Sequence, residues 1–160
     1  MKLSESIEAH ISLICKTEGV DRDLVKAIVM KESAGNTWAV RYEPAWKYFA
    51  DVQNHALKTR ISFETERTCQ AMSWGLMQVM GSVCRELLYE GDLTKLCQED
   101  IGLTYGIRKL RTLLKKHMIQ NDAIAAYNSG FPRLRADGKY MNQAYVDGVN
   151  AFLKIIKGKK

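Results

Sequence analysis

Residues 21–36, DRDLVKAIVMKESAGN, carry the clearest helical pattern of the chain. Apolar side chains recur there at spacings of three and four, which places them on one face of a helix: Leu24, Val25, Ile28 and Val29. Asp21 is a typical N-cap, and Gly35 and Asn36 are typical terminators. The stretch therefore predicts an amphipathic helix with its apolar face toward a core.

Glu32 lies on that apolar face, four residues after Ile28 and seven after Val25. It also falls in the last turn, where the helix dipole disfavours a carboxylate. Burial and the dipole both raise the pKa of a carboxyl group, as a general acid near neutral pH requires. The alternative is a structural carboxylate paired with an arginine.

Helical periodicity continues through the rest of the chain. An N-terminal run with Ile7, Ile11 and Ile14 ends at Gly19, and a long helix is predicted from Asp100 to His117. Asn121 or Asp122 is expected to cap the segment AIAAYNSG, and residues 140–158 form the last predicted helix.

Residues 37–73 are harder to interpret. Pro44 followed by AWKYFADVQNHAL indicates a helix from about 44 to 57, and Ser62 is expected to cap a short helix over FETERTCQAM. A further helix is predicted over SVCRELLYE, followed by a helical turn after Gly91 and Asp92. The one place where the sequence allows β-structure is a small hairpin near residues 37–43. We therefore predict one all-α domain over residues 1–160.

The composition of the 160 residues is that of one globular domain, with 46% hydrophobic and 26% charged residues. The net charge of +6 favours polyanionic partners, such as nucleic acid, anionic membranes or acidic cell walls. The basic residues flank no nucleic-acid-binding motif. The four cysteines have no CxxC spacing and the three histidines are isolated from them, so we predict free thiols and no metal site.

Four short motifs occur in a fixed order: KESAGN at 31–36, GLMQVM at 75–80, AAYNSG at 125–130 and YVDGV at 145–149. Together they resemble the soluble lytic transglycosylases, whose fold is similar to that of goose-type lysozyme. The resemblance implies a lysozyme-like helical domain with a glycan-binding cleft. It also implies peptidoglycan glycan strands as substrate and no cofactor.

The resemblance assigns roles to individual residues. Glu32 matches the catalytic acid, and the hydroxyl of Tyr145 is expected to approach it. The expected substrate-binding residues are Ser73, Gln78, Met80, Tyr127 and Asn128. Each of these also has a structural alternative, as a helix cap, a core side chain or a buried tyrosine.

The distance between the first two motifs departs from the family pattern, since 42 residues separate Glu32 from Gly75. Most aromatic residues of this insertion should pack it onto the domain, with Trp38, Tyr42 and Trp74 as candidate sugar contacts. The insertion also contains Glu64 and Glu66, which are candidates for a second catalytic carboxylate. Their alternative is a solvated pair in the first turn of a helix.

We expect cleavage between N-acetylmuramic acid and N-acetylglucosamine with formation of a 1,6-anhydromuramoyl end. One alternative is a goose-type hydrolase that uses the second carboxylate, and the other is a non-catalytic glycan-binding or particle-structural protein. The N-terminus shows no export signal. We therefore expect a phage lysis enzyme or a particle-associated one, made in the host cytoplasm and acting on the wall after release or delivery. We also expect a monomer. Its basic C-terminal helix is a candidate contact with the anionic envelope.

Overall fold

The structure is a computed structural model that describes residues 2–158. In chain order the elements are α1 (Glu5–Glu18), α2 (Arg22–Glu32), β1 (Val40–Tyr42), α3 (Val52–Thr59), α4 (Phe63–Gln70), β2 (Met72–Trp74), β3 (Val79–Met80), α5 (Gly81–Glu86), the 3-10 helix η1 (Leu93–Cys97), α6 (Glu99–Lys116), α7 (Gln120–Ser129) and α8 (Gln143–Lys157). This confirms the predicted all-α class. None of the helices in the described part is both long and apolar enough to cross a membrane.

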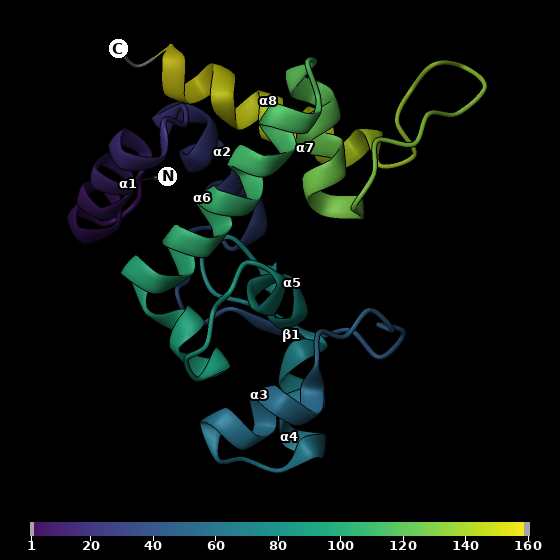
Figure 1. Cartoon of the computed structure of the whole chain (residues 1–160). Helices are drawn as coiled ribbons and strands as arrows, with labels where there is room; N and C mark the ends of the chain where they lie inside the picture. Colours follow the sequence, from purple (N-terminus) through teal and green to yellow (C-terminus); the bar gives the residue numbers. More distant parts are fainter. Residues whose placement is uncertain (1, 159–160) are drawn as a thin grey trace.

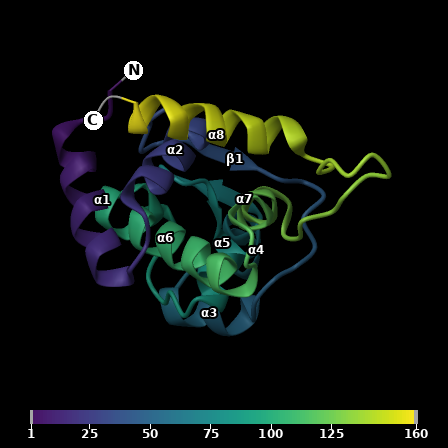
Figure 2. The ribbon, with the colours of Figure 1, turned by 90° about the horizontal axis from the view of Figure 1, so that it is seen from above.

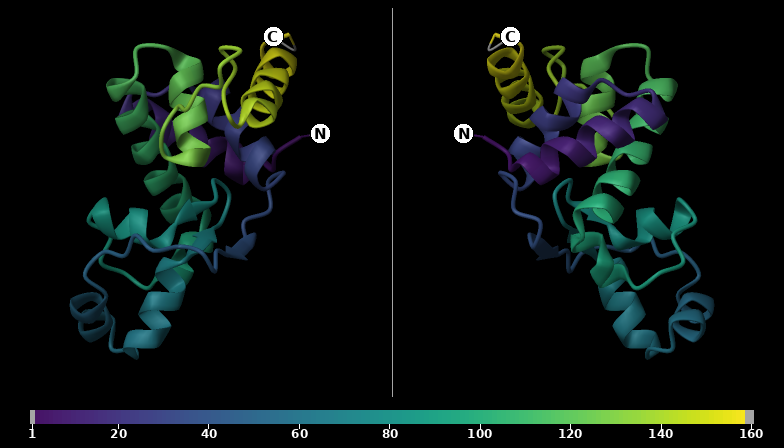
Figure 3. Two further views of the ribbon diagram at one scale, coloured as in Figure 1. Left: turned by 90° about the vertical axis from the view of Figure 1, so that its right-hand side faces the viewer. Right: turned by 90° about the vertical axis from the view of Figure 1, so that its left-hand side faces the viewer.

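The helices form a larger and a smaller part with α6 running between them (Figure 1). In the larger part α2 packs on α8, α1 packs on α6, and α6 packs on α7. Seen from above, α8 lies across α2 (Figure 2). The smaller part holds α3 and α4 below the sheet (Figure 3). Residues 130–142, between α7 and α8, project away from the body (Figure 1).

The apolar face of α2 forms the centre of the core. Val25 and Ile28 are completely buried, as are Leu103 and Ile107 of α6 and Val149 of α8. Each such side chain contributes about 1.5–3 kcal/mol through burial. Asp21 caps α2 by accepting a hydrogen bond from the backbone of Asp23, as predicted. This packing fixes the end of α2, and with it the position of Glu32.

A small antiparallel sheet lies at the junction of the two parts, in the order β1-β2-β3. Val40 pairs with Trp74, and Ser73 pairs with Met80. The strand near residues 37–43 is therefore real, but its partner is β2, more than thirty residues later, and not a local hairpin strand. Strands of two or three residues are too short to show alternation in the sequence.

The predicted helix over residues 44–57 is wrong in its first half. Residues 43–51 form a loop, and α3 begins only at Val52. Asp51 precedes it and accepts a hydrogen bond from the backbone N–H of Asn54, so the cap lies well after Pro44. The predicted cap of α4 is confirmed, because the Ser62 hydroxyl accepts from the backbone of the third helical residue.

The predicted caps of α7 are also wrong, because the side chains of Asn121 and Asp122 are engaged elsewhere. The helix begins at Gln120, before both of these residues, and has no side-chain cap. Asp122 instead accepts a hydrogen bond from the Tyr140 hydroxyl at 2.5 Å, and Asn121 accepts one from Asn150 at 3.0 Å. Tyr140 is thereby held in the loop, and α8 starts three residues after the predicted 140–158 boundary.

Candidate active site

Glu32 is the last residue of α2, and its carboxyl group is half-buried. The Tyr145 hydroxyl on α8 donates a hydrogen bond to its Oε1 at 2.6 Å. Burial raises the pKa of Glu32 above its ordinary value, and this effect exceeds the opposing effects of the Tyr145 hydrogen bond and the nearby cations. The direction of this pKa shift agrees with the one expected from the position of Glu32 on the apolar face of its helix.

The turn between β2 and β3 lies beside the end of α2. The Ser33 hydroxyl donates to the carbonyl of Leu76 at 2.8 Å, which ties the helix end to this turn. Gly75 adopts φ +65°, and a Cβ there would lie 2.4 Å from the carbonyl oxygen of Leu96. Only glycine fits at this point of the turn, both for its backbone conformation and for the space available.

Gln78 lines the site but uses its amide to hold the turn. Its Nε2 donates to the carbonyls of Ala39 and Gly75 at 2.8 and 2.9 Å, and its Oε1 accepts from the Ser73 hydroxyl at 3.0 Å. These contacts join β1 to the β2–β3 turn. Gln78 and Ser73 therefore shape the floor of the site, whatever further contact they make with a ligand.

Tyr127 and Lys109 form the wall contributed by α7 and α6. The Tyr127 hydroxyl donates to the carbonyl of Met77 at 2.9 Å, and Lys109 Nζ donates to the carbonyl of Tyr127 at 2.8 Å. Asn128 follows at the exposed rim, where its Oδ1 accepts from Asn142 at 3.0 Å. The AYN motif thus contributes one buried and one exposed residue to the site.

The opposite wall comes from the insertion between the first two motifs. Arg41 pairs with Glu43 through Nη2 and Oε1 at 2.5 Å. The following loop carries Trp46, and the side-chain amide of Gln70 clamps the end of this loop by bonding both the N–H and the carbonyl of Ala50 at 2.8 Å. Long-range contacts therefore place this wall.

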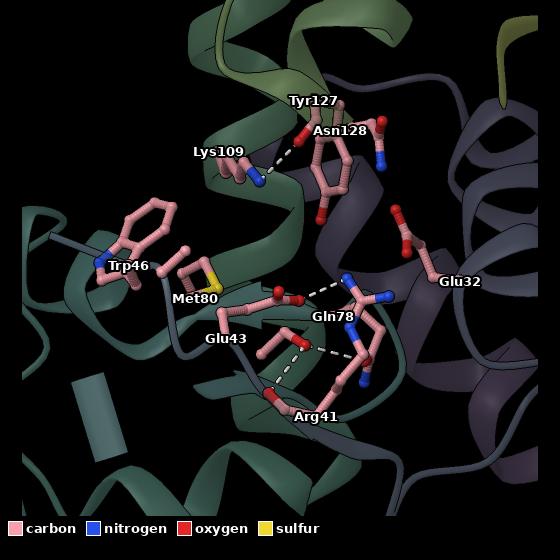
Figure 4. A pocket seen from close by; sticks show the side chains of 11 residues that line it. Glu32, Arg41, Glu43, Trp46, Gln78, Met80, Lys109, Tyr127 and Asn128 are labelled. Atoms are coloured by element: carbon pink, nitrogen blue, oxygen red, sulfur yellow. Dashed lines mark hydrogen bonds and ion pairs between the residues drawn. The ribbon is translucent and has the colours of Figure 1, made fainter. Parts of the chain in front are cut away.

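These walls enclose a pocket of about 300 Å³. Glu32 points toward it from one side, Lys109 and Tyr127 from another, and the Arg41–Glu43 pair from a third (Figure 4). The residues lining it are Glu32, Arg41, Glu43, Ala45, Trp46, Ser73, Gln78, Met80, Lys109, Tyr127 and Asn128. Tyr145 contacts this site through its hydrogen bond to Glu32.

The structure thus brings the five predicted substrate-binding residues, Ser73, Gln78, Met80, Tyr127 and Asn128, into one pocket with Glu32. The candidate second carboxylates lie elsewhere. Glu64 is exposed on α4, and Glu66 is completely buried in an ion pair with Arg85. A side chain so enclosed has no access to the pocket.

The predicted aromatic contacts also lie outside the pocket lining. Trp38 and Tyr42 are 75% and 52% exposed. Trp74 is buried, and its indole N–H donates to the carbonyl of Cys69 at 2.9 Å. The aromatic residue of the insertion that lines the pocket is Trp46, which the sequence had placed in a helix packed on the domain.

Sequence reasoning missed Arg41, Glu43, Trp46 and Lys109 as site residues. The first three sit on a loop placed by distant contacts, so no local pattern identified them. Lys109 follows Gly106 by one helical turn, but only the structure shows how tightly Gly106 is packed: a Cβ there would lie 2.4 Å from the Met77 sulfur. A buried glycine one turn away indicates that this face of α6 is covered, so a lysine there is not simply solvated.

Comparison with known proteins gives one result for the family. The family model described as "Transglycosylase SLT domain" matches residues 11–147. No curated protein and no solved structure matches the chain. The matched range contains Glu32, Tyr145 and all the residues that line the pocket.

Proposed function

Because the chain belongs to the transglycosylase SLT domain family, and so is a lytic transglycosylase of peptidoglycan, we propose that Glu32 is its single catalytic acid and base. The bond cleaved is the β-1,4 bond between N-acetylmuramic acid and N-acetylglucosamine. One observation carries this proposal: Glu32 is half-buried, held by Tyr145 at 2.6 Å, and opens on the pocket.

The first step uses the protonated carboxyl. Burial raises the pKa of Glu32, which favours the protonated carboxyl that donates its proton to the glycosidic oxygen. As the bond to the leaving sugar breaks, the 2-acetamido group of the substrate stabilises the oxocarbenium-like carbon. The leaving sugar departs with the proton, and Glu32 becomes a carboxylate.

The second step uses that carboxylate. It takes the proton from the 6-hydroxyl of the muramoyl sugar, and the hydroxyl oxygen attacks the anomeric carbon to close the 1,6-anhydro ring. Glu32 ends protonated, and no water is consumed. The Tyr145 hydrogen bond occupies Oε1, so Oε2 is the oxygen left for the substrate in both steps.

Mass spectrometry of the soluble products from purified peptidoglycan tests this scheme. Wild type should release fragments with anhydromuramoyl ends, and Glu32→Gln should release none. Glu86→Gln is a matched control, because it makes the same change at an exposed position of α5. Reducing ends from wild type, or release by Glu32→Gln, would contradict the scheme.

A hydrolase is the second candidate, because Glu43 brings another carboxylate to the same pocket. An inverting hydrolase needs such a group to activate water. In the structure, however, Glu43 Oε1 is already held by Arg41. The single-carboxylate scheme is therefore preferred, and the products of Glu43→Gln decide between the two.

The wider role is proposed from charge. With a net charge of +6, and with Lys154 and Lys157 in the last turn of α8, the protein suits the acidic bacterial envelope. We infer that it acts as a monomer on the wall in phage lysis, after synthesis in the host cytoplasm. Lysis of outer-membrane-stripped cells by the purified protein tests this role, and intact cells after addition of enzyme active on purified walls would contradict it.

A further inference from the structure

Lys109 differs from the other basic residues of α6 in its surroundings. Arg108 and Arg111 both pair with Glu18 on α1, and Lys115 is exposed in the last turn. Lys109 instead lines the pocket with Glu32. Within residues 2–158, no carboxylate lies at ion-pair distance from its Nζ. Its positive charge is therefore not neutralised by a direct partner.

The contacts of Lys109 fix the position of this charge. Nζ donates to the carbonyl of Tyr127 at 2.8 Å and lies 4.0 Å from the centre of the Tyr127 ring. A carbonyl oxygen and an aromatic face both stabilise a cation. An ammonium group has three N–H donors, and one of them is used here, so two remain for other partners. Lys109 is held as a cation in the wall of the pocket.

Several charged or titratable groups face Lys109 from the surrounding elements. They are Glu32 on α2, Cys84 on α5, Tyr127 on α7 and the Arg41–Glu43 pair on the opposite wall. Burial lowers the pKa of Lys109 to about 8, and Glu32 and Cys84 oppose this decrease. In return, the charge of Lys109 lowers the pKa of Glu32, against the larger effect of burial. The two groups are thus coupled across the pocket.

We propose that Lys109 is a positioning residue that acts through Glu32: its fixed positive charge stabilises the carboxylate that forms as Glu32 gives its proton to the substrate. This inference rests on the proposed function of Glu32. A charge that is already in place when the carboxylate forms needs no reorganisation during the reaction, which is how preorganised electrostatic groups lower a barrier. Tyr145 supplies the hydrogen bond to the same carboxylate, and Lys109 supplies the charge.

The direct test is the titration of Glu32 by NMR in protein with isotope-labelled glutamate side chains, with the resonance assigned by its loss in Glu32→Gln. In Lys109→Met the pKa of Glu32 should rise by about one unit, because a nearby positive charge has been removed. Lys109→Arg should restore the wild-type value. Lys115→Met, the same change at an exposed position of α6, should leave it unchanged. This measurement needs no activity, so it stands apart from the test of the proposed function.

The kinetic test follows from the same reasoning. In Lys109→Met, kcat should fall about tenfold or more with little change in KM, and the basic limb of the pH profile should move to higher pH with the pKa of Glu32. Lys109→Arg should recover most of the activity. An unchanged Glu32 titration in a folded Lys109→Met protein would overturn the proposal, as would a rise in KM alone. If wild type itself released no product while the titration shifted as expected, the proposed function would fail and the coupling would stand.

Discussion

Two carboxylates, the half-buried Glu32 in the pocket and the buried Glu66 in the smaller part, have opposite electrostatic environments. Arg85 donates to both oxygens of Glu66, at 2.8 and 2.9 Å, and Gln70 adds a bond to Oε1 at 2.9 Å. Glu32 accepts one hydrogen bond, from Tyr145, and faces open space. Glu66 accepts three hydrogen bonds from buried partners, whereas Glu32 accepts one and keeps one oxygen toward the pocket.

Their pKa values shift in opposite directions for this reason. Burial is the largest influence on both groups and raises the pKa of each. For Glu66 the hydrogen bonds from Arg85 and Gln70 and the charge of Arg85 together outweigh burial, so its pKa falls below the ordinary value. For Glu32 the hydrogen bond from Tyr145 and the nearby positive charges do not outweigh burial, so its pKa lies above the ordinary value. The comparison shows that the bonding partners, more than burial itself, decide whether a buried carboxyl remains an acid.

The buried carboxylate Glu66 also supports a wall of the pocket that Glu32 faces. Glu66 holds the amide of Gln70, and Gln70 clamps Ala50 at the end of the loop that carries Glu43 and Trp46 to the pocket. The buried pair with Arg85 thus anchors one wall of the site from outside it.

The largest effect is expected from Glu32→Gln. Removing a general acid and base should lower the rate of peptidoglycan cleavage about a thousandfold or more. The folded state should not be weakened, since the neutral amide avoids the burial of a charge. Turnover of purified walls and thermal unfolding, measured together, check this prediction, and a stability loss that parallels the activity loss would break the contrast with Glu66.

The next effect is expected from Arg85→Met, which leaves Glu66 buried without its partner. Breaking a buried ion pair in this way should cost about 3–5 kcal/mol of unfolding free energy. Urea unfolding measures it. Adding Glu66→Gln to Arg85→Met should recover part of the loss, because the unpaired charge is removed. If the Arg85→Met protein were as stable as wild type, the Glu66–Arg85 ion pair would not contribute to the stability of the fold.

Tyr145→Phe should have an intermediate effect on rate. A hydrogen bond to a charged group is worth about 1.5–3 kcal/mol, so cleavage should slow about ten- to a hundredfold. Because this bond lowers the pKa of Glu32, its loss should raise that pKa further and move the basic limb of the pH–rate profile upward. A profile with unchanged limbs would indicate that the tyrosine acts by packing alone.

The pH dependence of stability should separate the two carboxylates. The pKa of Glu66 in the folded protein lies below the ordinary 4.5, so its stabilisation is complete above 4.5 and is lost as pH falls through the folded pKa. The pKa of Glu32 lies above 4.5, so its contribution decreases as pH rises from 4.5 through the folded value. Glu32→Gln should therefore gain stability relative to wild type across that range, as measured by urea unfolding at a series of pH values. A constant difference would contradict the raised pKa.

The smallest effect is expected from Glu43→Gln. If a single carboxylate does the chemistry, this variant should cleave walls within about twofold of the wild-type rate, because its side chain is exposed to solvent in part and paired with Arg41. Turnover on purified walls measures it. A loss comparable with that of Glu32→Gln would instead make Glu43 the second carboxylate of a hydrolase.

The helical periodicity and the ordered motifs of the sequence were sufficient to predict α2 and several of the residues that line the pocket. The apolar face of α2 places Glu32 correctly, since 3.6-residue periodicity and an N-cap fix a helix without distant information. The ordered motifs brought Gln78, Met80 and Tyr127 to the same pocket. The helix predicted over 44–57 was wrong in its first half because Gln70, twenty residues after Ala50, holds Ala50 in the loop, and the helix starts only after its cap Asp51.

The remaining residues depend on contacts that the sequence does not display. The sequence shows Glu64 and Glu66 as two nearby acidic residues. It does not show that Arg85, nineteen residues after Glu66, pairs with Glu66. Lys109 lies in a run of basic residues over 108–116, and nothing in that run shows that tight packing at Gly106 covers its side of α6. The electrostatic environment of these charged side chains therefore depends on contacts between residues that are distant along the chain.

The central claim is that Glu32 cleaves glycan strands without water, and the most direct measurement is cleavage of purified peptidoglycan in water enriched in heavy oxygen. Mass spectrometry of the fragments should show anhydromuramoyl ends that carry no heavy oxygen, formed by wild type and Glu86→Gln but not by Glu32→Gln. Reducing ends labelled with heavy oxygen would show that water attacks the sugar, and the single-carboxylate account would be contradicted.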